Sequence, residues 1–270
     1  MATLLIGYDV ERPGAPDLTR TFLSAVRRVH GDLQAPCTFF LLGQVVEERS
    51  DDLAPLVGDP LFDMQQHTYS HLLLKTVCLD DGEKITLVRG GTLDQVDDEL
   101  GRANAIIKER LGVECTGLTG PWCYYRGLMD RPDLLEIVDR HGLRFLRTFG
   151  RNEKDFQPVP FEWQPFFYEP QGFPDILECM IHGWQDVHWK MIWGYDNLDA
   201  YLAHLRECVD AVAETDLVLS YGTHDWSSIE HDPELTVVRG LIEYAQRRGM
   251  RLLTYGDYYR ERIAGRNAAQ

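Results

Sequence analysis

Strand-like apolar segments alternate with helical patterns along almost the whole chain, and this alternation limits the possible folds more than any other feature. The apolar segments cover residues 4–9, 38–42, 62–66, 115–119, 144–147, 176–181, 217–221 and 251–254. Apolar residues at helical spacing cover residues 18–29, 93–111, 133–141, 198–213 and 233–248. Seven or eight such strand and helix units predict an α/β protein with a parallel sheet, closed or nearly closed.

The length of the chain suits one such barrel. At 270 residues it lies within the range of single-domain α/β barrels, and it contains no internal repeat, low-complexity tract or Ser/Gly-rich linker. We therefore expect one catalytic domain over residues 1–270. Residues 78–91 are expected to form an insertion loop, and residues 150–174 a second irregular segment. In the clearest helix, 93–111, Thr92 is expected as the N-cap and Gly112 as the stop.

Acidic residues dominate the charge, with 43 Asp and Glu against 27 Lys and Arg and a formal net charge of −16. This balance argues against nucleic acid and membrane surfaces as partners, and it favours neutral or cationic small substrates. No segment approaches the roughly 20 apolar residues of a membrane-spanning helix. The chain starts directly with an apolar strand pattern, which predicts a cytoplasmic protein. The oligomeric state stays open, a homo-oligomer included.

Polar residues follow several of the expected strands at the point where each strand ends. In barrels and open α/β sheets the functional site forms at these carboxyl ends, so the side chains there are expected to converge. Four strand ends carry them, with the sequences Asp9-Val10-Glu11, Gln66-His67, Thr119-Gly120-Pro121-Trp122 and Gly222-Thr223-His224-Asp225.

Two histidines and two carboxylates could form a metal centre. His67 and His71 are four residues apart, so a helical turn between them would bring both imidazoles to one face. Asp9 and Glu11 point the same way if the backbone is extended, so one can bind a metal while the other acts as a base. Two imidazoles and one carboxylate leave coordination positions open for water and substrate. Taken singly, the histidines also fit surface or capping roles, and the carboxylates fit a solvated strand end.

His224 follows an apolar strand pattern and precedes Asp225 and Trp226. A histidine at such a strand end could protonate a leaving group. On local evidence a structural histidine fits the position equally well.

Taken together and in order, these segments resemble the motifs of the polysaccharide deacetylase family, also called the NodB-homology or carbohydrate esterase 4 group. Asp9-Val10-Glu11 looks like the first motif, with the D-x-[DE] spacing of an intracellular branch of that family. The other four similar segments are Ala35-Pro-Cys-Thr-Phe-Phe-Leu-Leu-Gly43, His67-Thr-Tyr-Ser-His71, Gly117-Leu-Thr-Gly-Pro-Trp122 and Leu219-Ser-Tyr-Gly-Thr-His224.

The resemblance implies a distorted (β/α) barrel of about seven strands and hydrolytic removal of an acyl group from nitrogen. It implies a divalent metal ion on Glu11, His67 and His71, with zinc preferred and cobalt, nickel, iron and manganese as alternatives. The general base would be Asp9 and the general acid His224, although Asp9 and Glu11 could exchange roles. Residues beside the motifs are expected to bind substrate, namely Pro121, Trp122, Tyr124 and Trp226.

The fourth-strand motif departs from the family pattern, because Thr119 stands where an arginine is expected to hold the base. Arg12, Arg126 or Arg147 could replace it, and the sequence does not choose among them. The departure leaves open a catalytically inactive binding module.

The expected substrate is an N-acylated sugar or a related small compound, and the alternative is a cyclic amide or imide, as in the allantoinase-like members of the same branch. A non-haem iron oxygenase with two histidines and one carboxylate fits less well, because those enzymes use an all-β scaffold.

Overall fold

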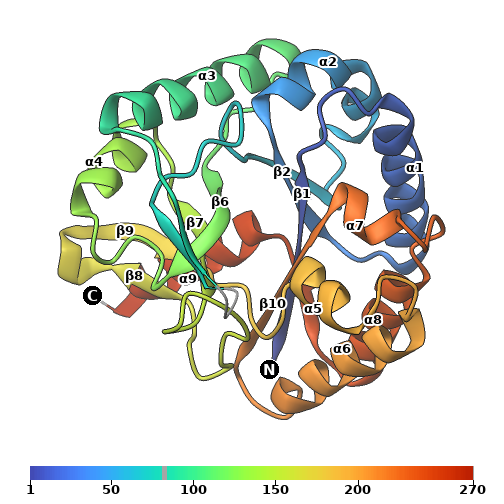
Figure 1. Ribbon diagram of the computed structural model, residues 1–270. Helices are drawn as coiled ribbons and strands as arrows, with labels where there is room; N and C mark the ends of the chain where they lie inside the picture. Colours follow the sequence, from blue (N-terminus) through green and yellow to red (C-terminus); the bar gives the residue numbers. More distant parts are fainter. Residues whose placement is uncertain (81–83, 270) are drawn as a thin grey trace.

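The computed structural model describes residues 1–80 and 84–269 of the chain (Figure 1). Its centre is a mostly parallel sheet, which confirms the predicted α/β class. The parallel strands follow one another in the order β10-β1-β2-β3-β6-β7-β9, and β11 also pairs with β1. Their bounds are β1 (Thr3–Val10), β2 (Cys37–Leu41), β3 (Phe62–Gln66), β6 (Gly117–Tyr125), β7 (Phe145–Arg151), β9 (Phe173–Glu178), β10 (Val218–His224) and β11 (Arg251–Leu253).

The segment after β9 connects the two ends of this sheet. The backbone N–H of Ile181 donates to the carbonyl of Phe149 on β7 at 2.8 Å, and the N–H of His182 donates to Ser220 on β10 at 3.0 Å. The Nδ1 atom of His182 in turn accepts the N–H of Ser220 at 3.0 Å. These bonds make the sheet a distorted barrel. A short strand, β8 (Phe166–Tyr168), pairs antiparallel with β9 at its side.

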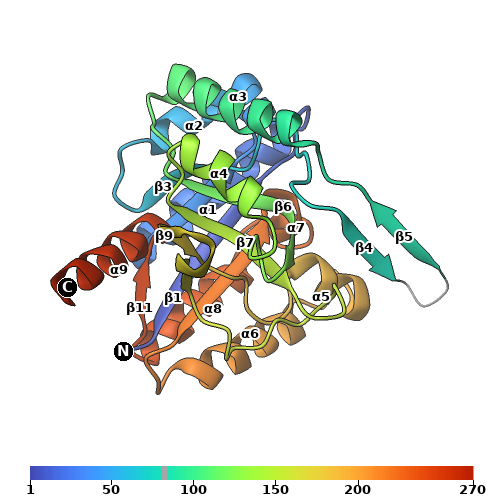
Figure 2. The ribbon, with the colours of Figure 1, turned by 90° about the vertical axis from the view of Figure 1, so that its left-hand side faces the viewer.

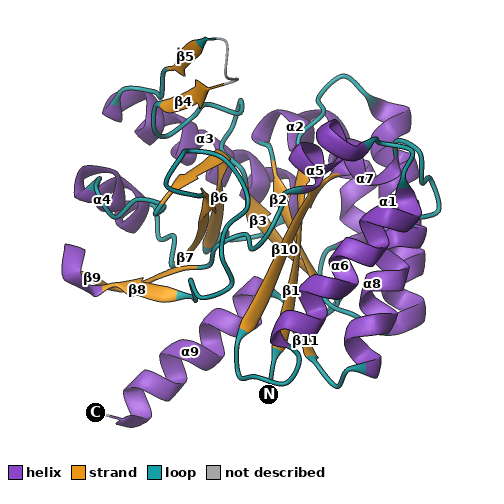
Figure 3. Ribbon diagram, turned by 60° about the horizontal axis from the view of Figure 1, so that its bottom comes forward, coloured by secondary structure: helices purple, strands orange, loops and turns teal. Residues whose placement is uncertain are grey.

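Helices cover the outside of the sheet (Figures 1 and 3). The longest, α3, begins at a capping box in which the Thr92 side chain accepts the N–H of Gln95, and it ends at Gly112 in the left-handed conformation, as expected. The helices are α1 (Pro16–Leu33), α2 (Gly43–Leu53), α3 (Leu93–Leu111), α4 (Pro132–Arg140), α5 (Asp186–Trp193), α6 (Leu198–Val212), α7 (Asp225–Ile229), α8 (Thr236–Arg247) and α9 (Tyr255–Ala269), with 3-10 turns η1 (Ala54–Leu56) and η2 (Glu169–Gln171).

The predicted insertion loop at residues 78–91 is wrong in part, because two strands form there. Antiparallel strands β4 (Val77–Asp80) and β5 (Ile85–Val88) form a hairpin that projects from the body of the molecule (Figure 2). The β-branched residues of both segments favour the extended backbone. Residues 81–83 of the predicted loop lie outside the described residues.

No helix in the described part of the chain is long and apolar enough to cross a membrane. The six cysteines, all within that part, are free, and five of them are buried.

Candidate metal centre and active site

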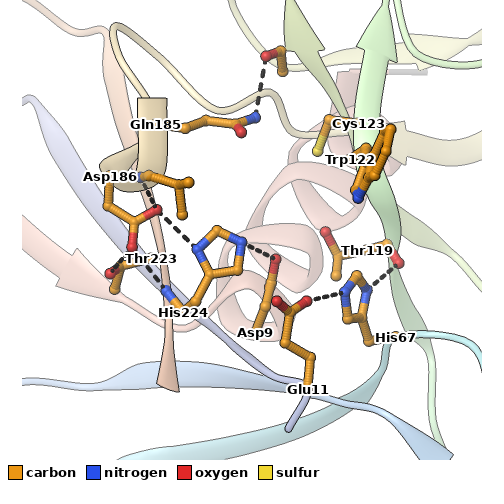
Figure 4. A network of polar contacts seen from close by, with 12 residues as sticks. Asp9, Glu11, His67, Thr119, Trp122, Cys123, Gln185, Asp186, Thr223 and His224 are labelled. Atoms are coloured by element: carbon orange, nitrogen blue, oxygen red, sulfur yellow. Dashed lines mark hydrogen bonds and ion pairs between the residues drawn. The ribbon is translucent and has the colours of Figure 1, made fainter. Parts of the chain in front are cut away.

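The predicted site residues from β1, β3 and β10 meet at one cleft of about 850 Å³. The cleft is lined by both carboxylates of the first motif and by all three predicted histidines, namely Asp9, Glu11, His67, His71 and His224. Figure 4 shows four of these side chains, from the ends of β1, β3 and β10, pointing toward one another. The carboxyl ends of parallel strands thus bring together residues that are more than 200 positions apart in the sequence.

Glu11, His67 and His71 form the more compact of two possible ligand groups. The Nε2 atoms of His67 and His71 lie 3.2 and 2.9 Å from the same carboxylate oxygen, Oε2 of Glu11. The other carboxylate oxygen, Oε1, accepts the indole N–H of Trp226 at 3.0 Å. Burial opposes the negative charge of Glu11, but His224 and the bonds to His67 and His71 outweigh it and lower the Glu11 pKa well below its usual range.

The expected helical turn between the two histidines is absent, although their rings still meet with centroids 4.9 Å apart. Thr68 and His71 adopt positive φ angles of 64° and 68°, which a helix does not allow. The loop is held instead by Glu99 of α3, whose carboxylate accepts the N–H groups of Tyr69 and Ser70 at 3.0 and 2.7 Å. The buried carboxylate of Glu99 therefore fixes the loop between the two histidines, a role that the prediction assigned to a helical turn.

The chemistry of this donor set fits a divalent transition metal. His67 donates its Nδ1–H to the carbonyl oxygen of Thr119 at 3.0 Å, so Nε2 is the atom left to face Glu11. Metal-bound histidines are commonly oriented in this way by a backbone carbonyl. Two imidazole nitrogens and one carboxylate oxygen, all within 4.8 Å of one another, match the ligand types of a catalytic zinc site.

Asp9 is paired with Arg147, and this pair identifies which of the three candidate arginines holds the Asp9 carboxylate in the absence of an arginine at position 119. The guanidinium of Arg147, on β7, donates from Nη2 to Oδ1 of Asp9, while its Nε donates to the Thr119 hydroxyl at 2.9 Å. Arg147 is fully buried, and although burial opposes its charge, Asp9 raises the pKa of the guanidinium. The other two candidates lie elsewhere, with Arg12 over the Trp226 ring and Arg126 over Tyr125.

His224 belongs to the second group, with Asp9 and Glu11, but its environment suits an acid better than a ligand. Its Nδ1 bonds to Oδ1 of Asp186 at 2.8 Å, and its Nε2 lies 4.0 Å from Oδ2 of Asp9. Burial disfavours the imidazolium, but Asp186 and Glu11 outweigh it and raise the His224 pKa to about 10. The ring is therefore protonated at neutral pH and directs an N–H into the cleft.

Asp186 has no counterpart among the predicted site residues. It is the first residue of α5 and is completely buried. Besides His224, its carboxylate accepts the Thr223 hydroxyl at 2.7 Å, and His224 lowers its pKa despite burial. Like the residues that were predicted, it follows the end of a strand, β9, so the same reasoning could have indicated it.

The four predicted substrate-binding residues divide into two pairs. Trp122 and Trp226 line the cleft. Pro121 is buried, and Tyr124 is 1% exposed with its hydroxyl accepting the N–H of Leu74 at 2.7 Å, so neither is placed to touch a substrate. The cause is a bulge in β6. Thr119 pairs with Arg147 and Tyr124 pairs with Phe149, so four residues of β6, 120–123, lie opposite a single residue of β7.

Several solved structures share this fold. One is a Mycobacterium smegmatis protein classed as a polysaccharide deacetylase, with 13% identity over 98% of this chain and 91% of that chain and a TM-score of 0.69. The Puue allantoinase shows 14% identity over 96% and 89% of the two chains, with a TM-score of 0.69. A carbohydrate esterase family 4 pseudoenzyme from Bacillus anthracis shows 13% identity over 95% and 65%, with a TM-score of 0.57.

At these identities the structural likeness concerns the fold alone, and it extends to a protein described as a pseudoenzyme. No curated protein sequence matches the chain significantly. The family model described as polysaccharide deacetylase matches residues 13–146, a segment that includes both His67 and His71. With the model match, the shared fold and the ordered motifs in agreement, the chain belongs to the polysaccharide deacetylase family.

Proposed function

We propose that this protein is a metal-dependent amide hydrolase that removes an acyl group, most simply acetyl, from the nitrogen of a small substrate. One observation carries the proposal. Three groups suited to different roles lie in one cleft. They are a possible metal-ligand set of Glu11, His67 and His71, the carboxylate of Asp9, which is paired with an arginine, and His224, whose pKa is raised.

Glu11, His67 and His71 would hold the metal, with zinc as the proposed ion because imidazole and carboxylate ligands suit it. When bound, such a cation acts as a Lewis acid toward the acyl carbonyl and makes water a stronger nucleophile. Asp9 is less suited to this ligand set, because one of its oxygens is already engaged by Arg147.

The two groups that flank the ligand set would move protons. Asp9 directs its second oxygen, Oδ2, into the cleft, where it can take a proton from the attacking water. His224 carries a proton at neutral pH and can pass it from Nε2 to the departing amine nitrogen. Asp186 then compensates the charge and keeps the ring oriented, while Arg147 keeps Asp9 in place.

The size of the cleft supports a substrate larger than a cyclic imide. A volume of about 850 Å³ lies in the upper part of the usual range for small-molecule sites. An N-acylated sugar or a compound of similar size is therefore the first candidate. A cyclic amide remains the second, because the fold is equally similar to that of an allantoinase.

A hydrolysis panel with the zinc-loaded protein tests the proposal. It would contain N-acetylglucosamine, its phosphates, aryl acetamides, allantoin and simple cyclic imides, with and without a chelator. We expect chelator-sensitive release of acetate, and Asp9→Asn should keep the zinc and lose turnover by about 100-fold or more. The matched control is Asp59→Asn, an exposed position away from the cleft. Hydrolysis of cyclic amides alone would favour the second candidate, and a zinc-loaded protein that cleaves nothing would contradict the proposal.

A further inference from the structure

Two glycines lie opposite each other on neighbouring strands of the barrel. Gly7 of β1 pairs with Gly222 of β10, and two residues further along the same strands Asp9 pairs with His224. Residues two apart on a strand face the same side of the sheet. Both glycines therefore lie on the face that carries the proposed base and the proposed acid.

Backbone conformation does not account for these two glycines. Neither Gly7 nor Gly222 has a φ angle in the positive range, so residues with a side chain could adopt the same backbone. Glycine inside a strand weakens it, and it often marks a place where another group comes close. Space is therefore the reason for glycine at both positions.

The group that takes up this space is the guanidinium of Arg147. A Cβ atom at Gly222 would lie 2.5 Å from Nη1 of Arg147, and a Cβ atom at Gly7 would lie 3.0 Å from the same nitrogen. Cβ atoms in proteins essentially never come within 3.0 Å of a non-bonded heavy atom. A side chain at position 222 would therefore displace the end of Arg147, and one at position 7 would crowd it.

Nη1 is held by its surroundings and not by a hydrogen bond. Among the described residues it has no acceptor, although Arg147 is fully buried. The Phe40 ring lies against the guanidinium, with Cζ of Arg147 4.5 Å from the ring centroid. Tyr255 packs edge-on against Phe40 with ring centroids 5.4 Å apart, and it would lie 3.2 Å from a Cβ atom at Gly7. We call the space that holds Nη1 the guanidinium slot; its walls are Gly7, Phe40, Gly222 and Tyr255.

The guanidinium slot determines where the other nitrogens of Arg147 point. A guanidinium is planar, so fixing two of its nitrogens fixes the third. Nη1 lies in the slot and Nε donates to the Thr119 hydroxyl at 2.9 Å, which leaves Nη2 directed at Oδ1 of Asp9. Displacement of Nη1 would therefore turn Nη2 away from the carboxylate that it holds.

We propose that Gly7 and Gly222 are positioning residues for the proposed base, because the slot that they leave lets an arginine from β7 hold Asp9. An arginine on β7 can replace the one missing from β6 only where β1 and β10 both leave this space. This inference rests on the proposed function, and it adds a requirement at two positions that carry no reactive group.

The variant Gly222→Ala, made both with Arg147 and with Arg147→Lys, tests the guanidinium slot. Lysine keeps the positive charge but has no second terminal nitrogen, so it does not need the slot. With Arg147 present we expect kcat to fall about tenfold to 100-fold, which corresponds to one lost hydrogen bond between charged groups, while KM and zinc content stay within about twofold.

In the Arg147→Lys background the further loss in kcat should be less than about threefold, because the contact of the new Cβ with Ile181 is common to both backgrounds and cancels. The urea midpoint of unfolding should follow the same pattern and fall at least about twice as far with Arg147 as with Arg147→Lys. This second measurement does not depend on any enzymatic activity.

Two further variants complete the experiment. Gly7→Ala approaches Nη1 from the other strand, so it should also lower kcat at unchanged zinc content, and it requires no change at Arg147. Gly31→Ala, in α1, is the matched control, because a Cβ atom there meets no atom within 4 Å. It should leave kcat and zinc content unchanged.

The possible outcomes separate the inference from the proposed function. Equal losses for Gly222→Ala in the two backgrounds would come from a general disturbance of the barrel, and they overturn the inference. Normal kcat in Gly222→Ala with Arg147 present also overturns it. If even the unaltered protein hydrolyses no amide, the proposed function is contradicted and the urea midpoints decide alone: unequal decreases support the slot, and equal decreases overturn it.

Discussion

The two sides of the cleft hold histidines of the same chemistry in opposite electrostatic settings. On one side His67 donates Nδ1–H to a backbone carbonyl, that of Thr119, and on the other His224 donates to the carboxylate of Asp186. A neutral carbonyl stabilises a positive charge on the ring far less than a buried carboxylate does. We therefore expect the partner of Nδ1 to decide whether Nε2 is suited to bind a metal or to act as an acid.

Substitution of a ligand histidine should have the largest effect. His71→Ala removes one of two imidazole donors, so we expect zinc affinity to fall by at least about 100-fold and turnover to disappear with it. Competition with a chromogenic chelator measures the affinity, and the exposed His231→Ala is the control. Full zinc content together with normal turnover in His71→Ala would mean that the metal site lies elsewhere.

Asp186→Asn should affect only proton donation by His224. It removes the negative charge that holds the His224 pKa near 10, so the pKa should fall and the alkaline limb of the pH–rate profile should move to lower pH. At neutral pH we expect a loss of about 10²- to 10⁴-fold in kcat, with zinc content unchanged. A profile that keeps its alkaline limb in place would remove the Asp186 and His224 pair from proton transfer.

Thr119→Val should have a smaller effect on activity, through the position of the proposed base Asp9. It removes the hydroxyl that accepts from Nε of Arg147 and donates to the Arg147 carbonyl, but it keeps the backbone carbonyl that orients His67. Only the bond from Nε reaches Asp9 through the guanidinium. Loss of one hydrogen bond of ordinary strength corresponds to about threefold to tenfold in kcat/KM, and Thr119→Ser should restore the activity. If Thr119→Val also loses zinc, the two sides of the cleft are not independent.

A third histidine tests the rule without touching catalysis. His30 is buried, with Nδ1 bonded to the carbonyl of Ala35 at 2.7 Å, and burial lowers its pKa to about 4. Between pH 6.5 and 4 the unfolded chain therefore binds more protons than the folded one, so stability decreases as the pH falls through this window. Between pH 7 and pH 5 the His30 contribution is about 2 kcal/mol.

Urea unfolding at both pH values measures this difference. In His30→Gln the decrease should be smaller by that amount, while turnover at pH 7.5 stays normal. Because burial also lowers the pKa of His182 to about 4, part of the decrease should remain. An unchanged decrease in His30→Gln would mean that burial does not lower the His30 pKa.

The sequence allowed the fold and the base of the cleft to be predicted for one physical reason. In a parallel sheet, strand ends meet, so polar residues that follow apolar strands converge whatever the details of the loops. This places Asp9, Glu11, His67 and His224 together. Asp186 follows the same rule, but it lies beyond a shorter polar stretch, His182-Gly-Trp-Gln-Asp186, that no motif emphasises.

Other features depend on contacts that no local pattern contains. The choice of Arg147 over Arg12 and Arg126 is made by strand pairing, and the loop of His67 and His71 is fixed by Glu99 from a distant helix. Burial of Tyr124 follows from the bulge in β6, whose length only the pairing with β7 reveals.

Thr119 and Arg147 are direct partners on the neighbouring strands β6 and β7. A charge that leaves one strand can therefore be supplied from the adjacent one, because the long arginine side chain spans the distance between strands. A sequence search that requires an arginine at position 119 would miss the carboxylate–arginine pair of this chain. A search that also reads position 147, on the neighbouring strand, would find it.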